Sequence, residues 1–311
     1  MYKLSNRTKT KISKYSKQFV AKLLIFILLI GFSYVILYPF LFKILAAFMS
    51  KEDLYNPLVE IVPLNWSLDN ILWVIDNAGF LEALKNTLFY ALLSGVLATA
   101  TAALVGYGIS KFKFKGANVL TFLIIVIMLM PIQTLSIPIY LNFRFFDPFS
   151  IITLFGGEAA ELTGTPWPLI IMSATGFSFR AGVFIILMRQ YYIGVPNELI
   201  EAAYVDGAGP FKTFFTIIIP MAKSMLIVIF SLSFAWQYTD TFYSDLLLSN
   251  VNMLPSMTAL LSQINLENVE YYLNYVRGNT AQILSILPLI IFYCILQKQI
   301  IQGIERSGLV G

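Results

Sequence analysis

The sequence of 311 residues contains no histidine and only one cysteine, Cys294. Without histidine the chain cannot build a Ser-His-Asp or Cys-His catalytic site, a histidine general base, or a zinc site with histidine ligands. A single cysteine cannot form a disulfide within the chain, and Cys294 lies in an apolar run where it is expected to serve packing. The sequence therefore predicts no catalytic residue and no metal site.

Charge is also scarce, since charged residues make up 12% of the chain and hydrophobic residues 58%. Soluble domains carry about a quarter charged residues, so this composition indicates a protein whose solvent is lipid. A helix needs ~20 apolar residues to cross ~30 Å of hydrocarbon. Six runs reach or approach that length, and each predicts a transmembrane helix. These runs are 23–42, 86–110, 116–143, 162–188, 224–239 and 278–297.

The runs are continuously apolar, which favours helices over the alternating strands of a transmembrane β-barrel. Helices also satisfy every backbone hydrogen bond within one segment, as lipid requires. The predicted fold class is an all-α integral membrane protein with six transmembrane helices.

The distribution of lysine and arginine predicts the orientation. Seven basic residues and no acidic residue lie in 1–22, namely Lys3, Arg7, Lys9, Lys11, Lys14, Lys17 and Lys22. Such a cluster can bind nucleic acid or anionic lipid, but beside a transmembrane helix it more often marks the cytosolic side. With 1–22 inside, the basic residues at 111–115, Arg189 and Lys298 fall inside too. Both termini are therefore predicted to be cytosolic.

Two spans carry signs of special packing. Small residues recur at every fourth position of the second span, at Ser94, Ala98, Ala102 and Gly106. Such a stripe lets another helix approach closely. In the third span, Pro131 and Pro138 each remove a backbone donor and together predict a kink. Transporters use such kinks to place polar backbone near a pathway.

Two charged residues lie in or beside the apolar runs. Arg180 stands towards the end of the fourth run, and Asp240 follows the fifth. Ionisable residues inside a membrane are costly and need a partner or a route to water. One hypothesis is an intramembrane Arg180–Asp240 pair. The alternative is that each side chain reaches the interface by itself.

The segment between the fourth and fifth spans carries the most informative pattern. Residues 201–220 read Glu-Ala-Ala-Tyr-Val-Asp-Gly-Ala-Gly-Pro and then Phe-Lys-Thr-Phe-Phe-Thr-Ile-Ile-Ile-Pro. Pro196 is expected to start a short helix that Gly207 and Gly209 end. Pro210 is expected to begin a second helix that Pro220 limits. The pattern predicts a compact helix–turn–helix on the cytosolic side.

This segment resembles the signature of permease subunits of binding-protein-dependent ABC importers. That signature reads Glu-Ala-Ala, three residues, Gly, nine residues and Ile-x-Leu-Pro, and here Ile219 replaces the leucine. The resemblance covers roughly 20–311 and is strongest to carbohydrate permeases similar to the shorter permease of the maltose transporter. The other segments that carry it are 63–70, 86–87, 106–116, 130–131, 137–138, 206–208 and 297–311.

The resemblance implies a type I ABC importer permease fold in a bacterial-type plasma membrane. The chain would form half of the pathway for a carbohydrate of oligosaccharide type, delivered by an extracytoplasmic binding protein. Implied partners are a second, similar permease subunit and two copies of an ABC ATPase. The chain has no Gly-x4-Gly-Lys-Ser/Thr phosphate loop, so ATP and Mg would be used by that ATPase, and the chain itself is predicted not to be an enzyme.

The resemblance also assigns residues. Coupling to the ATPase is expected of Glu201, Ala202, Ala203, Asp206, Gly207, Ala208 and Pro220. In the family this loop docks on the ATPase, so Glu201 would contact it, and Ala202 and Ala203 would permit close docking. The tail 307–311 is expected to reach the ATPase, and the outer stretch 252–263 to enter the binding protein.

Aromatic and amide side chains suit sugars, which offer apolar faces and hydroxyl groups. The pathway candidates are Gln133, Asn142, Trp236, Gln237 and Tyr238. Each of them could equally be a packing residue. The outer segment 147–166 is longer than is usual in the group, so the particular sugar does not carry over.

The predicted organisation has four parts: 1–22, a basic cytosolic segment; 23–83, the first transmembrane helix and an outer loop; 84–303, a core with five transmembrane helices and the cytosolic coupling loop 190–221; and 304–311, a cytosolic tail. Alternatives are an ABC permease for a non-sugar solute and an ion-driven secondary transporter. A polytopic membrane enzyme is disfavoured, because no cluster of carboxylates stands out in the spans.

Overall fold

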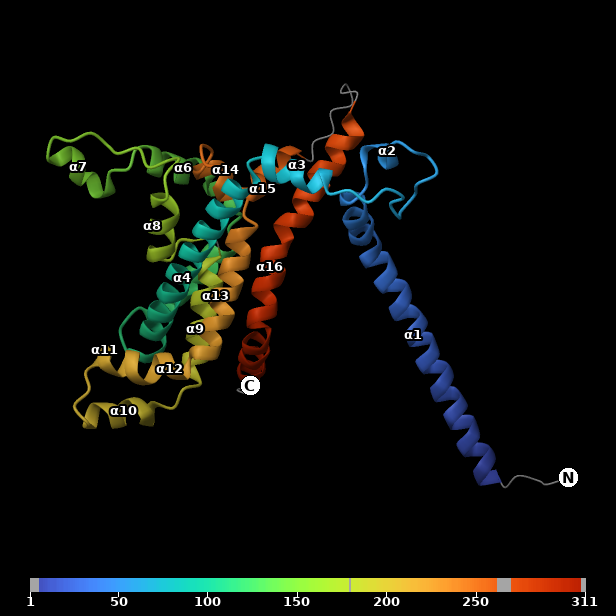
Figure 1. Ribbon diagram of the computed structural model, residues 1–311. Coiled ribbons are helices and arrows are strands. Elements are labelled where there is room, and N and C mark those ends of the chain that lie inside the picture. The colour runs from blue at the N-terminus through green and yellow to red at the C-terminus, as the bar shows by residue number, and fades with distance from the viewer. Residues whose placement is uncertain (1–5, 179, 262–269, 309–311) are drawn as a thin grey trace. The chain divides into compact units, whose positions relative to one another are not determined.

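The computed structural model describes residues 6–178, 180–261 and 270–308, and the regular structure in these ranges is helical (Figure 1). The chain divides into two compact units. The first comprises Met1–Val74 and Ser262–Ile283, and the second comprises Ile75–Leu261 and Leu284–Gly311. Three predicted features lie wholly or partly outside the described residues: Lys3, the end of the outer stretch 252–263, and 309–311 in the C-terminal tail.

The first unit contains α1 (Asn6–Ala47), α2 (Lys51–Leu54), most of α3 (Asp69–Asn77) and the start of α16 (Tyr271–Gly308). The predicted span 23–42 lies inside α1, and its apolar side chains are exposed from Leu23 to Leu41. A small core forms where α1 ends, because Ala46, Met49 and Leu54 pack against Leu273 and Val276 of α16. The first unit is therefore held together at one end of α1.

Hydrogen bonds fix the loop that follows α1. Both carboxylate oxygens of Asp53 accept from Asn65, one from its backbone N–H at 2.7 Å and one from its side chain at 2.8 Å. The buried Asn70 side chain donates to the carbonyl oxygen of Met49 at 2.9 Å. The segment 63–70, which carried part of the family resemblance, thus closes the loop onto its own beginning.

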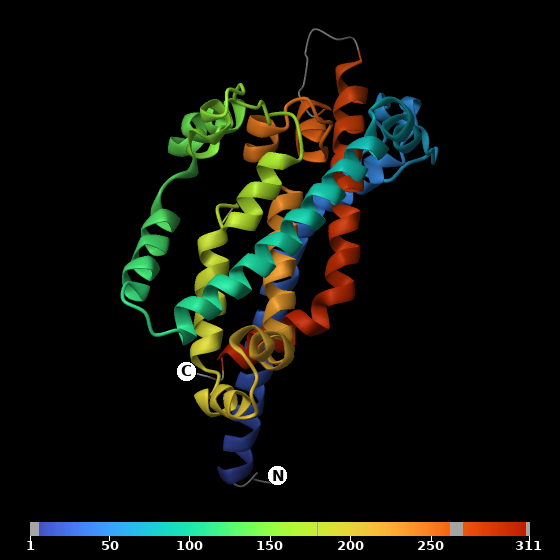
Figure 2. The ribbon, with the colours of Figure 1, turned by 90° about the vertical axis from the view of Figure 1, so that its left-hand side faces the viewer.

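The second unit holds the remaining helices. They are α4 (Phe80–Lys111), α5 (Ala117–Leu129), η1 (Ile132–Leu135), α6 (Ser136–Arg144), η2 (Pro148–Ser150), α7 (Ile151–Leu154), α8 (Trp167–Thr175), α9 (Ala181–Ile193), α10 (Asn197–Val205), α11 (Pro210–Thr213), η3 (Phe214–Ile218), α12 (Ile219–Met221), α13 (Lys223–Tyr238), α14 (Phe242–Leu247) and α15 (Leu254–Leu261). Helices α10, α11 and α12 gather at one end of this unit, and α6, α7 and α14 gather at the other (Figures 1 and 2).

Three helices in the described residues are long and apolar enough to cross a membrane, and five spans result if each bent helix pair counts as one. The long helices are α1 from Gln18, α4 and α16, and the bent pairs are α5 with α6 and α11–α12 with α13. The remaining predicted span, the fourth (162–188), is divided between α8, which ends at Thr175, and α9, which begins at Ala181. All six apolar runs contain helix, but two of them, 116–143 and 162–188, are divided between more than one helix.

The two prolines of the third span have different effects. Helix α5 ends before Pro131, and the following helical stretch turns away by 99°. Pro138 lies instead in the first turn of α6, where its missing N–H has no helical partner to lose. The kink predicted in this span is confirmed as a full break at Pro131, and Pro138 does not interrupt a helix.

Helix α4 forms the centre of the second unit and packs against α8, α9 and α13. Its small residues Ser94, Ala98, Ala102 and Gly106 are all buried. A Cβ on Gly106 would lie 2.7 Å from the Met188 Cβ and 2.9 Å from the Arg189 backbone nitrogen. The close approach predicted from the stripe is confirmed, with α9 as the helix that approaches at Gly106.

The opposite end of α4 is tied to the segment before α15. The Asn86 side chain donates to the Asn252 carbonyl oxygen at 3.0 Å, and the Thr87 hydroxyl accepts from the buried Leu254 N–H at 2.9 Å. Met253 and Leu254 are almost completely buried. The outer stretch predicted to enter a binding protein therefore begins as part of the core rather than as a projecting loop.

Candidate functional site

Helix α10 and the turn after it form the centre of the candidate coupling site. Gly207 has φ +79° and follows the last helical residues. The Gly207 N–H donates to the Tyr204 carbonyl at 3.0 Å, and the Ala208 N–H donates to the Ala203 carbonyl at 2.9 Å. This is the hydrogen-bond pattern of a Schellman cap, and its left-handed residue is usually glycine. The predicted end of the helix at Gly207 is confirmed.

The faces of α10 differ sharply in exposure. Ile200 and Ala203 are buried, whereas Glu201 and Ala202 are exposed and Val205 is 88% exposed. Ile200 belongs to the hydrophobic core that also includes residues of α4, α9 and α13. The docking role predicted for Ala203 therefore needs correction, since its methyl group packs within this chain. Glu201 and Ala202 remain on the outward face.

A bent connection joins α10 to the long helix α13. Pro210 occupies the first turn of α11, and a π-helical turn, η3, precedes α12. Pro220 cannot donate a helical hydrogen bond, and the helix ends one residue later with a 79° bend into α13. The Tyr191 hydroxyl donates to the Met221 carbonyl at 2.7 Å and holds this bend against α9.

Further contacts, which were not predicted from the sequence, fix the coupling loop to α4. The Lys111 ammonium donates to the Val195 carbonyl at 2.6 Å and to the Asn197 side-chain oxygen at 2.8 Å, just where α10 begins. The Tyr107 ring lies 4.9 Å from the Phe214 ring, measured between centroids. In the sequence, Lys111 belongs to a basic cluster that predicts the orientation of the chain, and no pattern indicates its contact with the start of α10.

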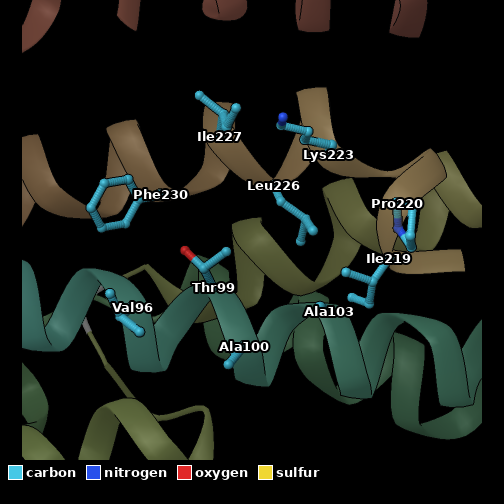
Figure 3. A pocket seen from close by; sticks show the side chains of 10 residues that line it. All are labelled: Val96, Thr99, Ala100, Ala103, Ile219, Pro220, Lys223, Leu226, Ile227 and Phe230. Carbon is cyan, nitrogen blue, oxygen red and sulfur yellow. The ribbon is translucent and has the colours of Figure 1, made fainter. Parts of the chain in front are cut away.

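An apolar groove of about 450 Å³ lies beside the bend, between α4 and α12–α13 (Figure 3). Its lining residues are Val96, Thr99, Ala100, Ala103, Ile219, Pro220, Lys223, Leu226, Ile227 and Phe230. The hydroxyl of Thr99 donates to the Gly95 carbonyl at 2.7 Å within α4. The groove therefore offers few polar groups to a sugar, which binds through several placed hydrogen bonds.

The structure separates the five predicted pathway residues. Gln133 and Asn142 are exposed, in η1 and α6. Gln237 and Tyr238 are buried, and the Tyr238 hydroxyl donates to the Ser285 carbonyl of α16 at 2.8 Å. These two side chains are packed inside the chain, which corrects their assignment to the pathway in this conformation. Trp236 is partly buried, and the guanidinium of Arg180 lies over its ring.

Among the described residues, Arg180 and Asp240 do not form a salt bridge with each other. The Arg180 guanidinium lies over the Trp236 ring, with Cζ 4.6 Å from the ring centroid. Asp240 is buried, and one carboxylate oxygen accepts from the Tyr243 and Ser244 backbone N–H groups at 3.0 Å each. Asp240 thus caps the start of α14, and the hypothesis of an Arg180–Asp240 pair does not hold among the described residues.

Comparisons with known proteins agree with this architecture. Residues 95–306 match the family described as binding-protein-dependent transport system inner membrane component. The arabinooligosaccharides transport system permease protein AraQ of Halalkalibacterium halodurans is 24% identical, over 95% of this chain and 100% of the relative. The sn-glycerol-3-phosphate transport system permease protein UgpE of Escherichia coli O1:K1 / APEC is 23% identical, over 88% of this chain and 92% of the relative.

A solved structure has the same fold. It is the crystal structure of a bacterial ABC transporter involved in the import of the acidic polysaccharide alginate. One of its chains is 22% identical and superposes with a TM-score of 0.72, covering 96% of this chain and 99% of that chain.

Proposed function

Because this chain belongs to the family of binding-protein-dependent transport system inner membrane components, we propose that it forms half of the pathway of an ATP-driven importer for a carbohydrate. It is a multi-pass membrane protein and a transport component rather than an enzyme. The name of one relative supports this solute class, since that protein serves arabinooligosaccharides, whereas another relative serves sn-glycerol-3-phosphate, a phosphorylated polyol. The solved importer of alginate has the same fold.

The outward face of α10 is the observation that carries the coupling mechanism. Glu201, Ala202 and Val205 are exposed on a helix whose other face is anchored in the core. A negative charge beside a small residue and an apolar one suits docking into a cleft of a separate ATPase. Gly207 ends this helix, and Pro220 ends the connection to α13. A displacement of α10 would therefore be passed to α13 through packed, hydrogen-bonded elements.

The proposed assembly contains a second, homologous permease subunit, two copies of an ABC ATPase and an extracytoplasmic binding protein. ATP and Mg would be bound by the ATPase. The ATPase is cytosolic in such an assembly, so α10 faces the cytosol of a bacterial-type cell. The positive-inside rule then places both termini on the same side, because the basic residues at 1–22 and 111–115 lie there.

The first test is purification of the tagged chain in mild detergent, with its partners identified by mass spectrometry. Recovery of a second multispanning subunit and an ATPase is expected. Glu201→Lys should remove the ATPase and keep the second permease, because it reverses charge only on the docking face. Glu158→Lys, the same charge reversal at an exposed site in the outer segment, is the matched control and should keep both partners.

Two results would contradict the proposal. A well-folded chain that purifies alone would leave α10 without a docking partner and favour a secondary transporter. If the Glu201→Lys variant retained the ATPase as well as the Glu158→Lys variant, Glu201 would not belong to the coupling surface. Uptake into proteoliposomes that needs ATP and is insensitive to an ionophore would separate the importer from an ion-driven carrier.

A further inference from the structure

The break between α8 and α9 places a charged residue deep in the transmembrane region. Helix α9 begins directly after Arg180 and continues to Ile193. At ~1.5 Å per residue this is about 20 Å of helix between Arg180 and the cytosolic end, in a hydrocarbon layer ~30 Å thick. Arginine at such depth is costly and almost always faces a protein interior or a water-filled cavity. The side chain of Arg180 is exposed on the surface of this chain.

The backbone at the break is strained. Arg180 has φ +59°, in the left-handed region that residues with a Cβ seldom adopt. Four residues earlier, Gly176 has φ +81° and ends α8. Non-helical backbone at membrane depth is tolerated where protein covers it or where it lines a water-filled path. Such strain persists where the surrounding structure holds it, and it is frequent at ligand sites.

A stack of side chains holds the guanidinium in place. Its Cζ lies 4.6 Å from the centroid of the Trp236 ring. The Trp236 ring in turn stacks on the Phe184 ring at 5.3 Å between centroids with an interplanar angle of 25°, and Phe184 is completely buried. Stacking uses the face of a guanidinium, whereas carboxylates and phosphates bind to the N–H groups at its edge. The stack therefore orients Arg180 for an anion.

Other features of the break also favour an anionic group. The first turn of α9 carries the positive end of the helix dipole next to Arg180. In the last turn of α8 and just after it, the hydroxyl oxygens of Ser173 and Ser178 are buried without a hydrogen-bond partner among the described residues. Buried unpaired hydroxyls are costly in a purely structural core.

On the basis of the proposed function, we infer that Arg180, held by Trp236, is a specificity-determining residue that binds the anionic group of an acidic saccharide or sugar phosphate in the pathway. Trp236 is a positioning residue in this arrangement. A headgroup of the cytosolic leaflet is out of reach as the source of the anion, because Arg180 lies about 20 Å of helix from the cytosolic end of α9.

The test uses the complex purified with its partners, reconstituted in proteoliposomes with ATP and the binding protein. Two pairs of radiolabelled probes are used, each with an acidic and a neutral member. They are trigalacturonate with galactotriose, and glucose 6-phosphate with glucose. Arg180→Gln should lower uptake of an acidic probe at least about tenfold relative to wild type, since a hydrogen-bonded charge is lost. Uptake of the neutral probe should stay within about twofold. Arg180→Lys should fall between, because an ammonium lacks the two-pronged geometry.

The acidic probe that responds identifies the anion as a carboxylate or a phosphate. Arg144→Gln is the control for loss of a positive charge, since Arg144 forms an exposed ion pair with Glu161 at 2.7 Å, away from the break. It should leave all uptake unchanged. Trp236→Phe should raise KM for the acidic probe more than it lowers the maximal rate.

Several outcomes would overturn the inference while leaving the importer intact. One is equal loss of acidic and neutral uptake in Arg180→Gln, which would indicate a purely structural role or a pair with the partner permease. Another is unchanged acidic uptake in that variant, and a third is wild-type import of neutral probes only. A wild-type complex that imports no probe with ATP would overturn the proposed function itself, and this inference with it.

Discussion

The cap of α10 at Gly207 offers a sharp test of how the coupling loop is shaped. A Cβ added to Gly207 would meet no atom within 4 Å, yet the residue has φ +79°. Alanine there would be penalised by its backbone conformation alone, at about 1–2 kcal/mol. The equilibrium between the capped and the opened end of α10 should shift by that amount, which corresponds to a factor of roughly 5–30.

Amide hydrogen exchange of the protein in lipid nanodiscs measures this equilibrium directly. The amides of Gly207 and Ala208 close the cap, so their exchange in Gly207→Ala should be faster by roughly 5–30-fold. Gly207→Asn should be affected less, because asparagine tolerates the left-handed region better. Gly209→Ala is the matched control, since Gly209 has φ −73° and equally open space.

The same series tests the coupling proposal. Retention of the ATPase during purification should decrease in the order Gly209→Ala, Gly207→Asn, Gly207→Ala, because the exposed end of α10 loses its fixed position.

The reasoning would be refuted if the amides of the cap exchanged at the same rate in Gly207→Ala and Gly209→Ala. If Gly207→Ala exchanged faster but retained the ATPase fully, the cap at Gly207 would be supported, and its role in docking the ATPase would be refuted.

Three further predictions concern stability, measured as thermal unfolding in detergent. Gly106→Ala should cost about 1–3 kcal/mol, because the new Cβ would crowd the neighbouring helix at 2.7 Å, whereas Gly108→Ala has open space in the same helix and should be neutral or slightly stabilising; equal effects would contradict this packing. Thr87→Val should cost about 1–3 kcal/mol, because the buried N–H of Leu254 loses its acceptor, and exchange in 250–261 should rise. Backbone and side-chain hydrogen bonds hold the pKa of Asp53 below its usual 3.8, so its contribution is present above about pH 4 and is lost as pH falls through the lowered pKa; Asp53→Asn should remove this acid dependence, and an unchanged pH profile would refute it.

Sequence reasoning succeeded where the determinant is local. Long charge-free runs predicted helices, since a backbone in lipid must satisfy its hydrogen bonds within the segment. Gly207 predicted the end of α10 because glycine adopts positive φ without a steric cost, and Pro131 predicted a break because it has no N–H. The stripe containing Gly106 predicted a close helix contact. Each of these properties belongs to a residue and its immediate neighbours.

The sequence did not show which face of each helix is turned towards the core. Ala202 and Ala203 are adjacent and chemically identical, yet only Ala203 is buried, because the core beneath α10 comes from helices distant in sequence. Likewise, Gln237 and Tyr238 suited a sugar by residue type, but both face inward. Burial of one helix face depends on the partners that pack against it.

Charge pairing was likewise decided by tertiary structure. The sequence shows that Arg180 needs a partner in the membrane, and Asp240 was the nearest acidic candidate on the next span. In the fold, backbone N–H groups of α14 satisfy Asp240, and Trp236 receives Arg180. The sequence by itself thus determined the helical membrane class and the coupling motif. Only the packing of α9 against α13 decided what lies beside Arg180, because that environment is built from segments about fifty residues apart.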